Sequence, residues 1–144
     1  MKIYIKSSEN SSTNNYSVSE RNLINDKSAD VRWEVANKTN DPEILAQLAD
    51  DPNWTIRWAV AFRADDPDIV AKLADDEDWQ VRRAVARKTK DQDILAQLAD
   101  DEDALVRLVV ARRIDDPDII AELANDENEQ VRNLAARRAT TINR

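Results

Sequence analysis

The feature that most constrains this chain is a 25-residue repeat that returns in phase five times. In every unit the seventh residue is Val or Ile, the eighth is Arg and the twelfth is Ala. The units begin at Asn25, Asp50, Asp75, Asp100 and Asn125. Self-similarity with a period of roughly 20–50 residues is typical of proteins that stack small structural units in a row. The sequence therefore predicts an all-α solenoid rather than a domain around one central core.

Each unit reads as two short helices. The second helix opens with an Asp suited to the N-cap and a Pro suited to the first helical position, as in Asp41-Pro42. Ile44 and Leu48 follow on one apolar face. The Asp pair that comes next, such as Asp75-Asp76, is expected to end this helix and to cap the following one. Neither helix buries its apolar face alone, so neighbouring units must stack.

The repeated pattern is Asp-x-x-x-x-Val-Arg-x-x-Val-Ala-x-Lys/Arg-x-x-Asp-Pro-x-Ile-Leu-x-x-Leu-Ala, over about residues 25–138. It resembles the leucine-rich repeat variant family. The resemblance implies a right-handed superhelix of alternating α- and 3₁₀-like helices without a sheet, and it leaves the function open. Some relatives carry an N-terminal iron–sulfur module, which a chain without cysteine does not share. HEAT-like repeats have the Asp, Val-Arg and Ala positions in common and are the alternative.

The ends of the chain differ from the repeated middle. Residues 1–16 are expected to form an arm and polar linker, in which residues 2–6 alternate like a short strand. A capping box at 17–20 predicts a half-repeat that covers the first unit. The predicted helical domain, residues 17–144, divides into a cap at 17–24, repeats at 25–49, 50–74, 75–99 and 100–124, a partial repeat at 125–138 and a tail at 139–144.

Missing residue types exclude most familiar catalytic machinery. Without Cys, His or Gly, the chain has no thiolate or imidazole metal ligand, no Ser-His-Asp triad and no Gly-rich phosphate loop. Acidic runs such as 75–78 lack the glycine turn of a calcium loop and are better explained as helix caps. We therefore expect no enzyme activity, no cofactor and no metal. The absence of a long apolar segment and of a signal peptide predicts a cytoplasmic protein without membrane contact.

Basic residues are concentrated in the first helices, although the net charge is −8. Two basic positions recur in every unit whatever their neighbours. Position 8 holds Arg32, Arg57, Arg82, Arg107 and Arg132, and position 14 holds Lys38, Arg63, Lys88, Arg113 and Arg138. We expect these cations to pair across unit junctions with the capping Asp41, Asp66 and Asp91, and so to fix the stacking register.

Positions 5, 9 and 13 vary from unit to unit and are spaced i, i+4, i+8, so they form one stripe along the first helices. All four tryptophans and the only phenylalanine fall in this stripe. Its candidate binding residues are an aromatic set, Trp33, Trp54, Trp58, Phe62 and Trp79, and a basic set, Arg83, Arg87, Arg112 and Arg137.

A stripe that varies on a constant scaffold is typical of a recognition surface, and Trp and Arg are favoured binding residues. The alternative is that the tryptophans fill grooves between units and the arginines are solvated. We expect a monomer, or a weakly self-associating chain, that binds another protein or a peptide. Nucleic acid, with bases on Trp and phosphates on Arg, is less favoured because the net charge is negative. A third reading makes the acidic caps an inhibitor that mimics nucleic acid.

Overall fold

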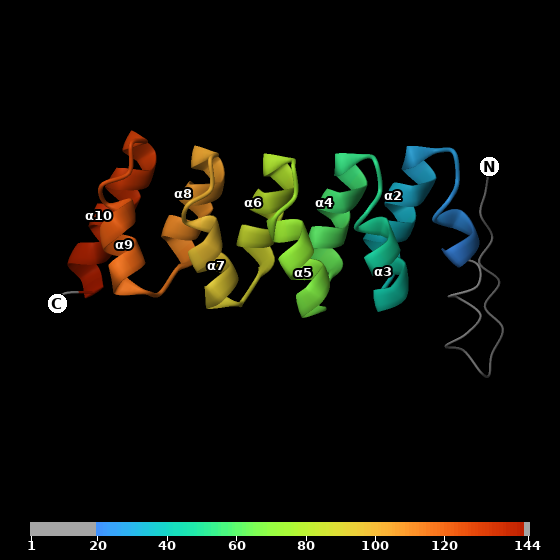
Figure 1. Cartoon of the computed structure of the whole chain (residues 1–144), viewed down its shortest axis with the longest axis horizontal. Coiled ribbons are helices and arrows are strands. Elements are labelled where there is room, and N and C mark those ends of the chain that lie inside the picture. Colours follow the sequence, from blue (N-terminus) through green and yellow to red (C-terminus); the bar gives the residue numbers. More distant parts are fainter. Residues whose placement is uncertain (1–19, 143–144) are drawn as a thin grey trace.

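The computed structural model describes residues 20–142, and these residues form helices joined by short turns, with no strand among them (Figure 1). Residues 20–23 are helical and precede the first full unit. The first helices of the units are α2 (Ala29–Lys38), α4 (Trp54–Arg63), α6 (Trp79–Lys88), α8 (Ala104–Arg113) and α10 (Glu129–Ile142). The second helices are α3 (Pro42–Leu48), α5 (Pro67–Ala74), α7 (Gln92–Leu98) and α9 (Pro117–Leu123).

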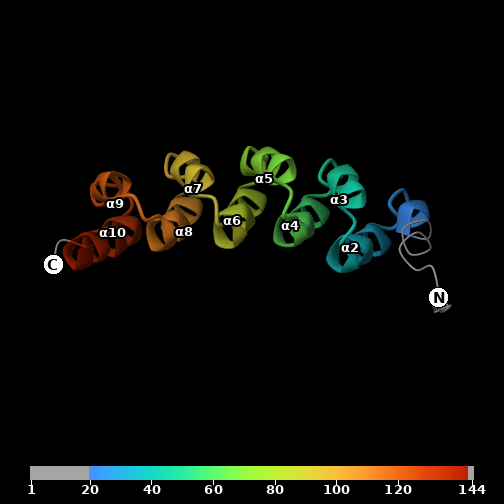
Figure 2. The same ribbon diagram turned by 90° about the horizontal axis from the view of Figure 1, so that it is seen from below.

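The helices form two layers in one shallow arch. In Figure 2 the first helices line the inner side of the arch and the second helices line the outer side. Each first helix packs on the first helix of the next unit, from α2 through to α10. This arrangement confirms the prediction of an all-α fold. The second helices are short α-helices, whereas the family resemblance had implied 3₁₀-like ones.

The second helices begin as the sequence predicts. The Asp41 carboxylate accepts a hydrogen bond from the Glu43 amide at 2.9 Å, and Pro42 is the first helical residue. The first helices begin differently from the prediction, because their N-cap is the fourth residue of the unit, as in Asp78. The Asp pair at the start of each unit therefore does not itself cap the first helix. Its second member, such as Asp76, instead accepts the amide of Asp78 at 2.9 Å.

The core is a continuous apolar seam between the two layers. Ile44 and Leu48 from α3 are buried together with Ile56 and Val60 from α4. The equivalent residues of the following units are also buried, except Ile94 and Ile119, which are half-buried, and Val131 of α10 is fully buried at the far end. The apolar core is thus supplied by positions that repeat, and the stripe positions contribute only partly buried side chains to its edge.

A ladder of arginine–aspartate pairs joins consecutive units. In one pair, Arg57 Nε and Nη2 donate to the two carboxylate oxygens of Asp76 at 2.8 and 3.1 Å, and Nη1 donates to the Asp51 carbonyl at 2.8 Å. The hydrogen bond to Asp76 raises the pKa of Arg57 above its usual value, and it outweighs the opposing effect of burial. The arginine ladder consists of Arg32–Asp51, Arg57–Asp76, Arg82–Asp101 and Arg107–Asp126.

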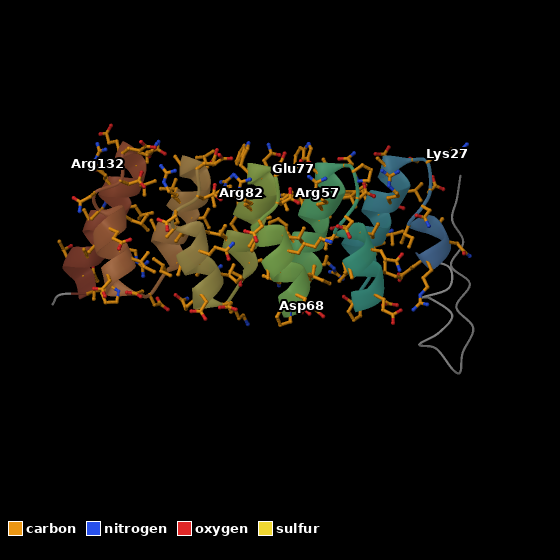
Figure 3. The ribbon with its side chains drawn as sticks, in the orientation of Figure 1. Lys27, Arg57, Asp68, Glu77, Arg82 and Arg132 are labelled. Carbon is orange, nitrogen blue, oxygen red and sulfur yellow. The ribbon has the colours of Figure 1, made fainter. Side chains whose placement is uncertain are left out.

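The predicted partners of the position 8 arginines, Asp41, Asp66 and Asp91, are therefore wrong. Those aspartates cap the second helices, while the ladder uses the second residue of the next unit, 19 residues further along the chain. Figure 3 shows Arg57, Arg82 and Arg132 along one edge of the solenoid, with Asp68 at the opposite edge. The turns that carry the ladder aspartates lie at the arginine edge, and the second helices begin at the other.

The position 14 cations make a different contact where they are arginines. Arg63 donates to the Thr39 carbonyl, Arg113 to the Ala86 carbonyl at 2.6 Å, and Arg138 to the Ala111 carbonyl at 2.9 Å. Each guanidinium therefore donates a hydrogen bond to a carbonyl at the carboxyl-terminal end of the first helix in the preceding unit. Carbonyls at that end lack a partner within the helix. The predicted pairing of this position with Asp41, Asp66 and Asp91 is also wrong.

The two ends of the predicted domain map are only partly covered by the structure. The arm at 1–16 and Ser17 of the capping box lie outside the described residues. Glu20 accepts a hydrogen bond from the Thr39 hydroxyl at 2.9 Å, which ties the helical residues 20–23 to the first unit. Helix α10 continues to Ile142, so residues 139–142 extend the last helix instead of forming a separate tail.

Candidate partner-binding groove

The stripe residues of the first three units, except Ala29 and Asn37, lie around one open groove of about 400 Å³. This groove, called the Trp/Arg groove below, crosses α2, α4 and α6. It is lined by Trp33, Trp54, Thr55, Trp58, Phe62, Trp79, Gln80, Arg83, Ala84 and Arg87. Because positions i, i+4 and i+8 fall on one face of a helix, each helix presents its stripe residues in a row.

The aromatic half of the Trp/Arg groove is partly open to solvent. Trp33 and Trp54 are 37% and 39% exposed, whereas Trp58 and Trp79 are half-buried. Trp58 meets Phe62 edge to face, with ring centroids 4.7 Å apart, a favoured geometry for aromatic pairs. The tryptophans are therefore neither sealed in the stack nor isolated on the surface. They form the wall and rim of the groove.

The basic half of the groove is formed by Arg83 and Arg87 on α6. Within residues 20–142, neither guanidinium makes an ion pair. Arg83 Nε is buried and has no hydrogen-bond acceptor in that part of the chain. A buried N–H group in a folded protein nearly always has an acceptor. The adjacent Arg82, in contrast, donates to the Asp101 carboxylate at 2.7 Å and belongs to the arginine ladder.

The remaining two predicted binding residues lie outside this groove. Arg112 on α8 and Arg137 on α10 are exposed and follow the groove along the stripe. Arg137 Nε donates to the Asn133 carbonyl of its own helix at 3.4 Å. Leu108, half-buried on α8, occupies the stripe position that Arg83 holds on α6. The stripe is thus continuous in sequence, but Arg112 and Arg137 do not take part in the groove that its residues line in the first three units.

Three groove residues were not predicted from the stripe. Thr55 and Gln80 occupy position 6, beside the stripe, and Ala84 occupies position 10. The signal for Ala84 is its small size, since an alanine between two long stripe residues leaves space beside the helix. Position 6 changes from unit to unit as the stripe does, so its variation could have marked Thr55 and Gln80.

A second hollow, of about 300 Å³, lies between the second and third units. Its walls mix Val70 and Ile94 with two cations of the third unit, Lys88 and Lys90, and with one carboxylate from each unit, Asp65 and Asp91. Charges of both signs are therefore available to neutralise each other there. Among the described residues, no Asp or Glu lines the Trp/Arg groove, so the charges of Arg83 and Arg87 are not neutralised within it.

The last residue of each of the acidic runs 75–78 and 100–103 caps the helix that follows it. Asp78 accepts the Gln80 amide at 2.8 Å, and Asp103 accepts the Leu105 amide at the same distance. Among residues 20–142, no group of three or more acidic side chains is arranged to hold a metal ion. None of the helices in that range is long and apolar enough to cross a membrane.

Comparisons of the chain with protein-family models, with curated proteins and with solved structures found no match.

Proposed function

We propose that this chain is a non-catalytic repeat scaffold that binds another protein or a peptide through the Trp/Arg groove. The observation that carries the proposal is the exposure of Trp33 and Trp54 in one groove with Arg83 and Arg87, which make no ion pair within residues 20–142. Trp and Arg dominate the energetics of protein interfaces because they combine large contact area with polar atoms. The repeat is already stabilised by its seam and its arginine ladder, so the groove residues are free for contact.

The scaffold we propose is a right-handed superhelix of the leucine-rich repeat variant type, working in the cytoplasm as a monomer or weakly self-associating chain. The repeated Val-Arg and Val-Ala positions support the family assignment. Nucleic acid is the alternative partner, because stacked rings and arginines also suit a single strand. The acidic caps leave a third option, a surface that mimics nucleic acid.

Selection from a displayed library of random peptides tests the proposal. Peptides selected on the natural chain are measured against a Trp58→Ala/Arg87→Ala double variant, which removes one residue from each half of the groove. We expect their affinity to fall by at least roughly 10-fold, because each is a groove contact of the kind that dominates binding.

The matched control is Leu105→Ala/Arg112→Ala. Leu105 is 39% exposed and Arg112 is exposed on the stripe, but neither lines the groove. This variant should bind the selected peptides as the natural chain does. Peptides that bind both double variants equally well would place the contact elsewhere and contradict the proposal. Competition with a single-stranded oligonucleotide at low salt measures the alternative.

A further inference from the structure

We infer that the Trp/Arg groove takes an extended peptide in which an apolar side chain and an acidic side chain lie two or three residues apart. This inference rests on the proposed function and adds the chemistry of the partner. Its basis is the order of side chains across the groove. Within residues 20–142, the side formed by α2 and α4 carries rings without a cation, whereas the side formed by α6 carries Arg83 and Arg87 beside Trp79.

The acidic requirement follows from Arg83 and Arg87. They are one helical turn apart on α6, so their guanidinium groups serve one region of the groove. Arg87 is exposed, and no carboxylate within residues 20–142 pairs with either arginine. A carboxylate is the ligand group that matches a guanidinium in both charge and geometry. A peptide Asp or Glu therefore completes this side of the groove.

The apolar requirement follows from the α2 and α4 side. Trp33, Trp54, Trp58 and Phe62 line it, with Thr55 as the one polar neighbour. Within residues 20–142, no Lys or Arg contributes to the lining on that side. An aliphatic or aromatic side chain in contact with these rings would displace water from partly exposed apolar surface, which favours binding.

The spacing comes from the helices that carry the two sides. Packed helices lie about 8–10 Å apart, and α4 packs directly on α6. An extended peptide advances about 3.3 Å per residue, so two or three residues span that separation. A peptide that runs along the solenoid axis places its apolar side chain near Trp58 and its acidic one near Arg83.

The same distribution of charge disfavours a nucleic-acid strand. A strand carries a phosphate at every nucleotide, so strong binding needs cations along its whole path. Among the residues that the structure describes, the cations of the Trp/Arg groove lie at its α6 side only. A peptide with one or two carboxylates matches this uneven charge.

The test uses intrinsic tryptophan fluorescence, because all four tryptophans of the chain line this groove. The probes are pools of short peptides without Trp or Tyr, in which Phe or Leu is followed two or three residues later by Asp or Glu. A matched pool carries Asn or Gln in place of the acids, and a third probe is oligothymidine. Natural chain, Arg83→Met, Arg87→Met and the control Arg112→Met are titrated, and circular dichroism checks that each is folded.

The acidic pool should reach half-saturation at a concentration about 10-fold lower than the amide pool, since a charged hydrogen bond is replaced by a neutral one. Arg83→Met and Arg87→Met should each reduce this preference, whereas Arg112→Met should retain it. Equal binding of the two pools, or a preference that survives in both groove variants, overturns the inference. If the amide pool binds as well as the acidic one and Trp58→Ala abolishes both, the groove function stands without the acidic requirement. Tighter binding of oligothymidine than of the acidic pool also overturns the inference, in favour of a strand.

Discussion

Arg82 and Arg83 are neighbours on α6, yet they belong to two regions, the arginine ladder and the Trp/Arg groove, and differ in their hydrogen-bond partners. Arg82 is 7% exposed and donates to Asp101 through Nε and Nη2 and to the Asp76 carbonyl through Nη1. Arg83 lies in the Trp/Arg groove with a buried Nε that has no acceptor within residues 20–142. Position 8 of the repeat, which Arg82 occupies, is an arginine in all five units. Position 9, which Arg83 occupies, is Trp, Trp, Arg, Leu and Asn in turn. Constant chemistry therefore marks the frame, and variable chemistry marks the surface left open.

The largest expected effect is a difference in the free energy of unfolding between Arg82→Met and Arg83→Met. Arg82→Met leaves Asp101 without its guanidinium, and losing one partner of a buried pair costs about 3–5 kcal/mol. Arg83→Met removes no ion pair, and we expect its free energy of unfolding to change by less than about 0.5 kcal/mol. Urea denaturation of the two variants measures both values. Similar losses in the two variants would show that the ladder and the groove are not separate.

A smaller effect is expected when lysine replaces an arginine of the ladder, because the positive charge stays but the planar guanidinium is lost. Arg107→Lys replaces two hydrogen bonds to Asp126, at 2.8 and 3.0 Å, by a single contact at best. We expect a loss of about 1–2 kcal/mol in the free energy of unfolding. Arg132 is the matched control, since within residues 20–142 its guanidinium contacts only the carbonyls of Asp126 and Glu127. Arg132→Lys should cost less than Arg107→Lys in the same denaturation experiment.

The ladder should also give the solenoid an acid-sensitive component. The hydrogen bond from Arg107 holds the pKa of Asp126 below its usual value, with help from the Asn128 amide and against the effect of burial. A carboxyl group whose pKa is lower in the folded state increases the free energy of unfolding. This contribution is fully present above the unfolded-state pKa of about 4. That stability is lost as the pH falls through the lower, folded pKa.

Denaturation between about pH 5 and pH 2 checks this dependence. Asp126→Asn should lower the free energy of unfolding at about pH 5, because Arg107 then lacks its carboxylate. The further loss on acidification should be smaller in this variant than in the natural chain. An equally steep loss in both would mean that Asp126 does not contribute to the acid sensitivity.

The sequence predicted the helices better than it predicted their contacts. Caps such as Asp41-Pro42 act within a few residues, so they can be read from the local sequence. The ladder could not be assigned in the same way, because Asp66 and Asp76 both recur every 25 residues and offer Arg57 equally plausible partners. Only the path of the turn decides that Arg57 meets Asp76.

The prediction of the binding stripe was limited in a similar way. The i, i+4, i+8 spacing predicts that Trp79, Arg83 and Arg87 share a helix face, and they line the same groove. Periodicity does not tell where a stripe is hollow, because a hollow depends on the sizes of side chains on neighbouring helices. The sequence therefore grouped Arg112 with Arg87, and the structure leaves Arg112 outside the groove.

The most direct test of the account is a map of the four tryptophan indole N–H signals by NMR during titration with a peptide selected on the natural chain. Each indole gives its own signal, and all four tryptophans line the Trp/Arg groove. If the peptide binds in the Trp/Arg groove, these signals should move in a saturable way, together with the Nε–H signal of Arg83, while those of Arg82 and Arg107 in the ladder stay in place. Binding that leaves the indole signals unchanged and moves residues elsewhere on the solenoid would contradict it.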